Sequence, residues 1–215
     1  AQIEEERELL IRETHHRSKN TVQGVGGLVQ RHLENHPDTK EALKEAVAQI
    51  RSIASVYGLQ SNGSQLPIEM RGLVEAILSA AKQITPDVHF ELRTWPEICH
   101  CRIAERESVP LALVINELLV NAAKHQEQRK KVVTVDLCCE PGEVVLTLSN
   151  PSPPLPEGFD MSAGRELGTG LNLVKSLLPS EGALLTIDHQ DGTTCTRLTL
   201  RAPVIARKSE DHSQG

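Results

Sequence analysis

Aromatic side chains are scarce in this chain of 215 residues, which contains one Trp, one Tyr and two Phe. Its core must therefore be built from aliphatic side chains, and a hydrophobic content of 39% is enough for one or two domains. Long apolar runs are also absent: no stretch of about 18 consecutive apolar residues occurs, and no basic segment leads into an apolar one. We therefore expect no membrane span, no signal peptide and a cytoplasmic location.

Two further absences limit the ligands and partners. The chain has 23 Lys and Arg against 29 Asp and Glu, a net charge of -6 at pH 7. Proteins that bind a nucleic-acid backbone concentrate Lys and Arg on one face, so this balance argues against a nucleic-acid partner. The five Cys lack the paired two-residue spacing of zinc ribbons, and we interpret them as reduced thiols in the core or in strands.

Several nucleotide-binding and hydrolase motifs are missing too. The sequence has no Walker-type Gly-Lys-Ser/Thr loop, and Gly168-Thr169-Gly170 does not follow a strand with the spacing of a dinucleotide-binding fold. No Gly-x-Ser-x-Gly turn occurs, so a hydrolase triad built on Ser has no support.

What the sequence does contain begins with a helical pattern at the N-terminus. At 100° per residue, His16 and Asn20 project to one side of the helix, and Val22 and Val25 project to the other. We therefore expect His16 to face solvent. Because the chain starts at Ala1 inside this pattern, we also expect that sequence upstream of it has been removed.

A second helix is predicted after the turn His36-Pro37-Asp38, and it extends to about Leu59. Two helices joined by a short turn form an antiparallel hairpin, and such a hairpin alone exposes two apolar stripes. We therefore predict that two copies of the chain pair into a four-helix bundle, as a homodimer. The apolar positions of the second helix are Leu43, Val47, Ile50, Ile53, Ala54 and Tyr57.

A linker of turn-forming residues, Ser61-Asn62-Gly63-Ser64, separates this hairpin from a second domain. There, helices are interspersed with strands, and Pro141-Gly142 and Asp191-Gly192 mark hairpin turns. This pattern predicts an α+β fold: the helical hairpin, then a sandwich with helices on one face of a mixed, mainly antiparallel sheet. The predicted helices are 73–84, 109–125 and 171–178, and the predicted strands are 88–92, 133–139, 144–149, 183–188 and 194–200. The predicted domains are the hairpin at 1–62, the sandwich at 63–204 and a polar tail at 205–215.

The helix predicted at 109–125 carries a polar strip made of Glu117, Asn121, Lys124 and His125. This strip lies about 130° round from the apolar stripe of the same helix. A carboxylate, a carboxamide and an ammonium group suit a hydrated Mg²⁺ that carries a polyphosphate, because Mg²⁺ needs only one or two protein oxygens. The alternative is the exposed polar face that an ordinary amphipathic helix has, and spacing alone favours that alternative.

Gly168 and Gly170 stand immediately before a predicted helix start. Backbone amides at the N-terminus of a helix favour a phosphate group, and glycine leaves those amides accessible. A flexible loop that ends in a helix cap explains the same residues equally well.

Taken together, three boxes resemble the transmitter region of bacterial sensor histidine kinases. They are His15–Asn20, Asn116–His125 and Gly168–Val174, in the order that this family has. The Arg17 that directly follows His16 is similar to the subfamily called HisKA_2. The resemblance implies a dimerisation and phosphotransfer hairpin, followed by a Bergerat-type (GHKL) ATP-binding domain, with a sensor domain upstream of this chain.

The resemblance also implies residue roles. His16 would be phosphorylated on a ring nitrogen by ATP and would pass the phosphoryl group to an Asp in the receiver domain of a response regulator. Arg17 would contact the phosphate, and Asn20 would orient water in the reverse, phosphatase reaction. Asn121 and Glu117 would bind Mg²⁺, and Glu117 would also polarise the attacking group. The remaining ATP contacts implied are Lys124, His125, Asn150, Gly168, Thr169, Gly170 and Leu171.

One departure from the family pattern concerns the box that contacts adenine. The family has an Asp-x-Gly-x-Gly-like box, whereas this chain has Asn150-Pro151-Ser152-Pro153-Pro154. The Asn150 carbonyl can accept the hydrogen bond from the adenine amino group but lacks the charge, which would weaken ATP binding by about tenfold, or about 1.4 kcal/mol.

That departure leaves an alternative hypothesis open. The chain could be a degenerate ATPase whose hairpin acts only as a phosphotransfer or docking module for a response regulator. The intact Glu117 and Asn121 favour the active kinase. An anti-sigma-type serine kinase on the same ATP fold is disfavoured by the hairpin that carries His16.

Overall fold

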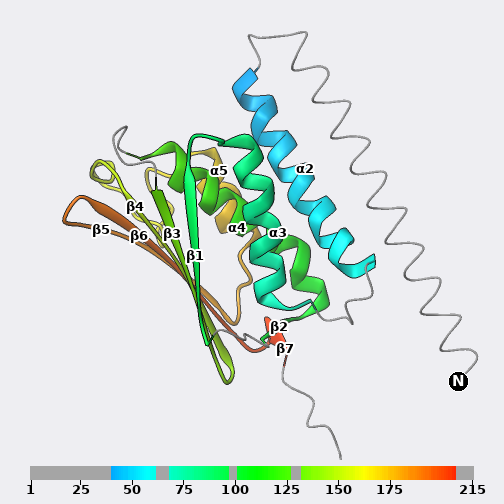
Figure 1. The fold of residues 1–215 in the computed structure, drawn as a ribbon. Coiled ribbons are helices and arrows are strands. Elements are labelled where there is room, and N and C mark those ends of the chain that lie inside the picture. The colour runs from blue at the N-terminus through cyan, green and yellow to red at the C-terminus, as the bar shows by residue number, and fades with distance from the viewer. Residues whose placement is uncertain (1–39, 62–67, 97–100, 127–131, 207–215) are drawn as a thin grey trace, which may run out of the picture.

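A computed structural model describes residues 40–61, 68–96, 101–126 and 132–206 of the chain. These residues form an α+β fold, as the sequence predicts, with a five-stranded sheet and helices on one of its faces (Figure 1). The helices are α2 (Lys40–Ser61), α3 (Met70–Ile84), α4 (Ser108–Lys124) and α5 (Thr169–Leu177), and a 3₁₀ turn, η2 (Glu105–Glu107), precedes α4. The strands are β1 (His89–Trp95), β2 (Arg102–Ile103), β3 (Val132–Glu140), β4 (Glu143–Pro151), β5 (Ala183–Gln190), β6 (Thr193–Arg201) and β7 (Ile205–Ala206).

The main sheet has the strand order β1-β3-β4-β6-β5. β1 pairs with β3 in parallel, and the other neighbours are antiparallel, so the predicted mixed and mainly antiparallel sheet is confirmed. Both predicted hairpin turns are present. Gly142 has a φ of 86°, and Asp191 and Gly192 have φ angles of 51° and 73°, the left-handed conformation that two-residue hairpin turns require.

Burial alternates along the strands and shows which face of the sheet the helices cover. On β4, Val144, Leu146, Leu148 and Asn150 are buried, whereas the residues between them are only partly buried. Because strand side chains alternate between faces, these four residues point to the helices. Asn150 is thus the last member of an otherwise apolar row.

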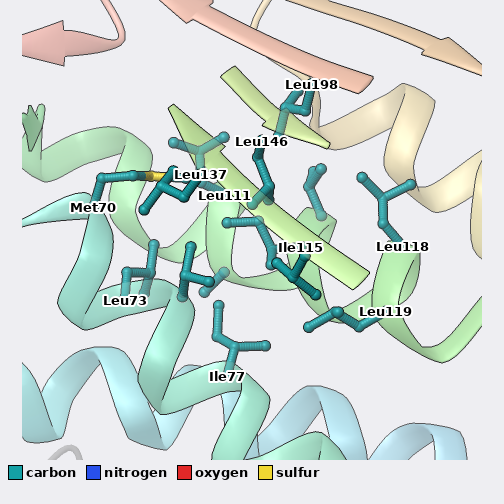
Figure 2. Packing of buried hydrophobic residues seen from close by; sticks show 14 of the residues in the cluster. Met70, Leu73, Ile77, Leu111, Ile115, Leu118, Leu119, Leu137, Leu146 and Leu198 are labelled. Carbon is teal, nitrogen blue, oxygen red and sulfur yellow. The ribbon is translucent and has the colours of Figure 1, made fainter. Parts of the chain in front are cut away.

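The helices are amphipathic and supply the other half of the core. On α3 the buried residues follow the spacing of one helical face, among them Leu73, Ile77 and Ala81. Figure 2 shows side chains from α3 and α4 meeting Leu137, Leu146 and Leu198 of the sheet. The core is aliphatic as predicted, and burying each Leu or Ile contributes about 1.5–3 kcal/mol.

Helix α2 lies outside α3 and α4 and packs against both (Figure 1). Val56 of α2 is fully buried and belongs to the same hydrophobic cluster as the buried residues of α3 and α4. The helix that the sequence assigns to the hairpin therefore shares a core with the sheet domain.

The prediction of a polar tail at 205–215 is wrong for its first two residues, Ile205 and Ala206, which form the strand β7. Val204 and Ile205 are buried, and Ile205 pairs with Ile103 in the short antiparallel ladder of β7 and β2. Two apolar residues after Arg201 were too few to give a strand pattern in the sequence, but they close the end of the core.

Two other expectations concern cysteines and membranes. Cys101, Cys138 and Cys195 are free thiols, whereas Cys139 is disulfide-bonded, so the expectation of reduced thiols is wrong for Cys139. Among the described helices, none combines the length and the hydropathy that crossing a bilayer requires.

Candidate active site

A cavity of about 680 Å³ lies between α4, the ends of β4 and β6, and the segment that leads into α5. Its volume falls within the range of about 300–1,000 Å³ that is typical of small-molecule sites. The sequence-predicted site residues that line it are Glu117, Asn121, Lys124, His125, Asn150, Gly168, Gly170 and Leu171.

The polar strip of α4 forms one wall of this cavity. Glu117 is only 5% exposed and Asn121 is half-buried, whereas Lys124 and His125 are exposed. Glu117 is therefore not part of an exposed polar helix face, which was the alternative interpretation of this strip. Asn121 Nδ2 and the side-chain amide of Gln126 are buried without a hydrogen-bond partner among the described residues, which leaves polar groups available to a ligand.

The start of α5 covers this wall. A Cβ atom on Gly170 would lie 2.7 Å from Glu117 Oε2 and 3.6 Å from both polar side-chain atoms of Asn121. A side chain at position 170 would therefore force the end of the Glu117 side chain to shift, and glycine allows α5 to approach α4 without that shift. Gly168 precedes the helix as its N-cap residue, and Thr169 is the first residue of α5.

A contact from α2 completes the surroundings of Glu117. Gln49 Nε2 donates a hydrogen bond to Glu117 Oε1 at 3.0 Å. The sequence did not single out Gln49, because the two residues are 68 positions apart and belong to different predicted domains.

The opposite wall is built from β4, β5 and β6. Asn150 is 3% exposed and pairs with Thr194 across the ladder of β4 and β6. Ser152 Oγ lies 2.6 Å from Thr194 Oγ1, and His189 Nδ1 lies 3.2 Å from Thr194 Oγ1 and 3.4 Å from Ser152 Oγ. These hydroxyl groups give the wall polar character at the point where the apolar row of β4 ends.

Thr194 and Thr196 both line the cavity, although the sequence analysis did not name them. They precede Leu198 and Leu200 on the same face of β6, so alternation along this strand could have placed them. Ser152 was noted only as a replacement for glycine.

A compact turn shapes the segment before α5. Asp160 accepts hydrogen bonds from the Ala163 backbone N–H (2.9 Å), the Ser162 hydroxyl (2.7 Å) and Arg165 Nη2 (3.0 Å). These donors, the Ala163 amide first, hold the pKa of Asp160 far below its usual range. Lys175 of α5 donates to the Ser162 carbonyl at 3.0 Å and ties the turn to the helix.

The predicted residues of the phosphoacceptor box, His16, Arg17 and Asn20, lie outside the described residues.

Asn116, next to the polar strip, is fully buried, and neither polar atom of its side chain has a partner among the described residues. Asn116 does not line the cavity.

The residues at the cavity fit a nucleotide with Mg²⁺. One carboxylate, Glu117, and one carboxamide, Asn121, stand together, and no group of three or more His, Cys, Asp or Glu side chains that could hold a metal occurs in the described part of the chain. Mg²⁺ keeps most of its water and uses one or two protein oxygens, so this donor set suits it better than it suits Zn²⁺.

Comparisons with known proteins identify similar chains. Residues 13–85 match HisKA_2, a histidine kinase family model. The sensor histidine kinase PdtaS of Mycolicibacterium smegmatis is 28% identical over 205 residues, which cover 92% of this chain and 40% of that relative. The chain thus spans 40% of the length of this curated relative.

Two solved structures have the same fold. The histidine kinase domain of the Erythrobacter litoralis EL346 blue-light activated histidine kinase has a TM-score of 0.62 at 13% identity, covering 91% of this chain and 94% of that chain. Full-length ShkA in complex with AMPPNP has a TM-score of 0.51 at 16% identity, covering 93% of this chain and 46% of that chain. The sequence matches therefore confirm the resemblance to sensor histidine kinases, and these two structures confirm the predicted α+β fold.

Proposed function

We propose that this chain is the transmitter region of a sensor histidine kinase, which binds Mg²⁺ and ATP in the cavity and phosphorylates His16. The observation that carries this proposal is the meeting of Glu117, Asn121 and the glycine-flanked start of α5 at one cavity. A carboxylate, a carboxamide and a helix N-terminus serve a metal-bound polyphosphate better than any other ligand of that size.

Each wall of the cavity has a task in this proposal. The start of α5, with Gly168 and Gly170, receives the phosphates at its backbone amides, and Lys124 and His125 add positive charge from the exposed end of α4. Glu117 and Asn121 hold the metal ion, which when bound neutralises the phosphate oxygens and favours transfer of the γ-phosphate.

The adenine base of ATP is placed at the wall that β4, β5 and β6 form. The carboxamide of Asn150 can accept a hydrogen bond from the adenine amino group, and burial makes that bond stronger than it would be in water. Leu171, which also lines the cavity, supplies apolar contact. The full-length ShkA neighbour was solved with the nucleotide AMPPNP, which supports a nucleotide in a cavity of this fold.

The later steps follow from the same proposal. The imidazole of His16 attacks the γ-phosphate of ATP with a neutral ring nitrogen, the bond from the γ-phosphorus to the bridging oxygen breaks, and ADP leaves. The phosphohistidine then passes its phosphoryl group to the carboxylate of an Asp of a response regulator, which regenerates the His16 imidazole. Arg17 contacts the phosphate, and Asn20 orients water in the reverse reaction. The hairpin at 1–62 forms a homodimer, and 63–204 is the catalytic domain.

Labelling with γ-phosphate-labelled ATP and Mg²⁺ tests this function. We expect acid-labile label on the wild-type chain, none on His16→Gln, and none on Asn121→Ala, which should keep the oligomeric state of the wild type in analytical ultracentrifugation. Full labelling of His16→Gln would refute the assignment of the acceptor.

The second candidate, a degenerate docking module, is motivated by Asn150 and the prolines after it, which line the cavity where the family has an Asp and glycines. Titration with a fluorescent ATP analogue and Mg²⁺ separates the two. Saturable binding below about 1 mM supports the kinase, whereas no binding at that concentration supports the docking module.

A further inference from the structure

The hydrogen bond between Gln49 and Glu117 joins two parts of the chain that the sequence assigns to different domains. Gln49 Nε2 lies 3.0 Å from Glu117 Oε1, and the carboxylate is only 5% exposed. Within the described part of the chain, Gln49 is the only side chain recorded as donating to this carboxylate. A carboxylate so far from water depends on the donors that the protein supplies.

The two oxygens of Glu117 have different surroundings. Oε1 is bound by Gln49 on α2, whereas Oε2 lies at the start of α5, 2.7 Å from the point where a Cβ on Gly170 would stand. The carboxamide of Asn121 is 3.6 Å from the same point. A bond to Oε1 therefore determines the orientation of the carboxylate and keeps Oε2 beside Asn121.

We propose that Gln49 is a positioning residue for Glu117. Its hydrogen bond holds the carboxylate in the rotamer that presents Oε2, next to Asn121, to the bound nucleotide and metal. This role rests on the function proposed above. Since α2 packs against both α3 and α4, any displacement of α2 along α4 withdraws the donor, so the state of the hairpin helix is coupled to the carboxylate of the ATP site.

Two substitutions separate positioning from packing. Gln49→Met keeps the length and most of the volume of the side chain but removes the donor. Arg51→Ala is the matched control on α2, because Arg51 donates to Gln83 of α3 at 3.2 Å on the exposed side and does not line the cavity.

In autophosphorylation, we expect Gln49→Met to lower kcat about tenfold while KM for ATP stays within about threefold of wild type, because a misdirected carboxylate affects the transfer step more than binding. Arg51→Ala should keep both constants. A Gln49→Met variant with wild-type kcat, or with the loss confined to KM, would overturn the proposal.

A measurement without nucleotide keeps this inference separate from the proposed function. Urea unfolding of wild type, Gln49→Met, Glu117→Gln and the double variant gives a double-mutant cycle, and we expect a coupling beyond experimental error. Zero coupling in a chain that labels with ATP would overturn the Gln49 role alone. A clear coupling in a chain that never labels would overturn the kinase function, and the role of Gln49 in transfer with it.

Discussion

At the scale of single residues, Gly170 matters because of its neighbour and not because of its own backbone. Its φ is not positive, but Glu117 Oε2 lies 2.7 Å from the point where a side chain would begin. The absence of a side chain at this position lets the start of α5 lie against the carboxylate without displacing it.

Gly170→Ala should accordingly impair labelling by ATP. We expect a loss of about tenfold or more in the labelling rate, because the Cβ must push the Glu117 carboxylate aside. Gly72→Ala on α3 is the matched control, since a Cβ there meets nothing within 4 Å. Equal labelling rates for the two variants would mean that the position of the carboxylate does not matter.

Asn150 is interpreted differently once its position in the structure is known. In the sequence it is a departure from an Asp box, and in the structure it is a buried carboxamide at the end of the apolar row of β4. Thr194 is its partner in the ladder, and the hydroxyl group of Ser152 lies against Thr194. A neutral side chain suits this buried position, because an unpaired carboxylate there would cost several kcal/mol.

At the scale of elements, the turn at 160–165 lies in the segment that leads into α5. Its order depends on one carboxylate, which accepts from the Ala163 amide, the Ser162 hydroxyl and Arg165. Lys175 of α5 then donates to the carbonyl of Ser162, so the turn is bonded directly to the helix. The residues that cap the cavity are thus oriented by groups that do not touch it.

Asp160→Ala should increase amide hydrogen exchange at 160–165 at pH 7, and Glu157→Ala in the same segment should not. Because the pKa of Asp160 is lowered on folding, its stabilisation is fully present above the ordinary aspartate pKa of about 3.9 and is lost as pH falls through the lower, folded value. The wild-type protection should therefore hold from pH 7 to about 4 and decline only below that. Protection lost already near pH 6 would show that another group holds the turn.

At the scale of the whole molecule, one aliphatic core joins the helices to the sheet. Ile77 of α3 is fully buried in it, whereas Leu184 of β5 is 60% exposed on the sheet. Figure 2 shows Ile77 in the same layer of side chains as Ile115 and Leu119 of α4. Since α2 contributes Val56 to this cluster, the stability of the cavity walls and the docking of α2 depend on one another.

Ile77→Ala should lower the free energy of unfolding by about 2–5 kcal/mol, because it leaves a cavity in a close-packed layer. Leu184→Ala, which removes an exposed apolar side chain, should change it by about 0.5 kcal/mol or less. Urea unfolding followed by circular dichroism measures both. Similar small losses for the two variants would show that the layer relaxes around the missing atoms.

Much of the fold could be predicted because its causes are local in the chain. The hairpin turns at Gly142 and Gly192 depend on neighbouring residues, and the buried rows of α3 and β4 depend on spacing within one element. The same local logic placed Glu117 and Asn121 one turn apart on α4. Two-residue strands such as β2 and β7 could not be predicted in this way, because they are too short to show a periodic pattern.

The sequence by itself determined the α+β class, the residue types of the candidate site and the resemblance to a family. Only the tertiary structure decided that α5 approaches Glu117 at Gly170, that Ser152 and Thr194 face Asn150's end of the cavity, and that Gln49 reaches Glu117. The physical reason is that contacts between residues 68 positions apart depend on how whole helices and strands pack, and no local pattern encodes that.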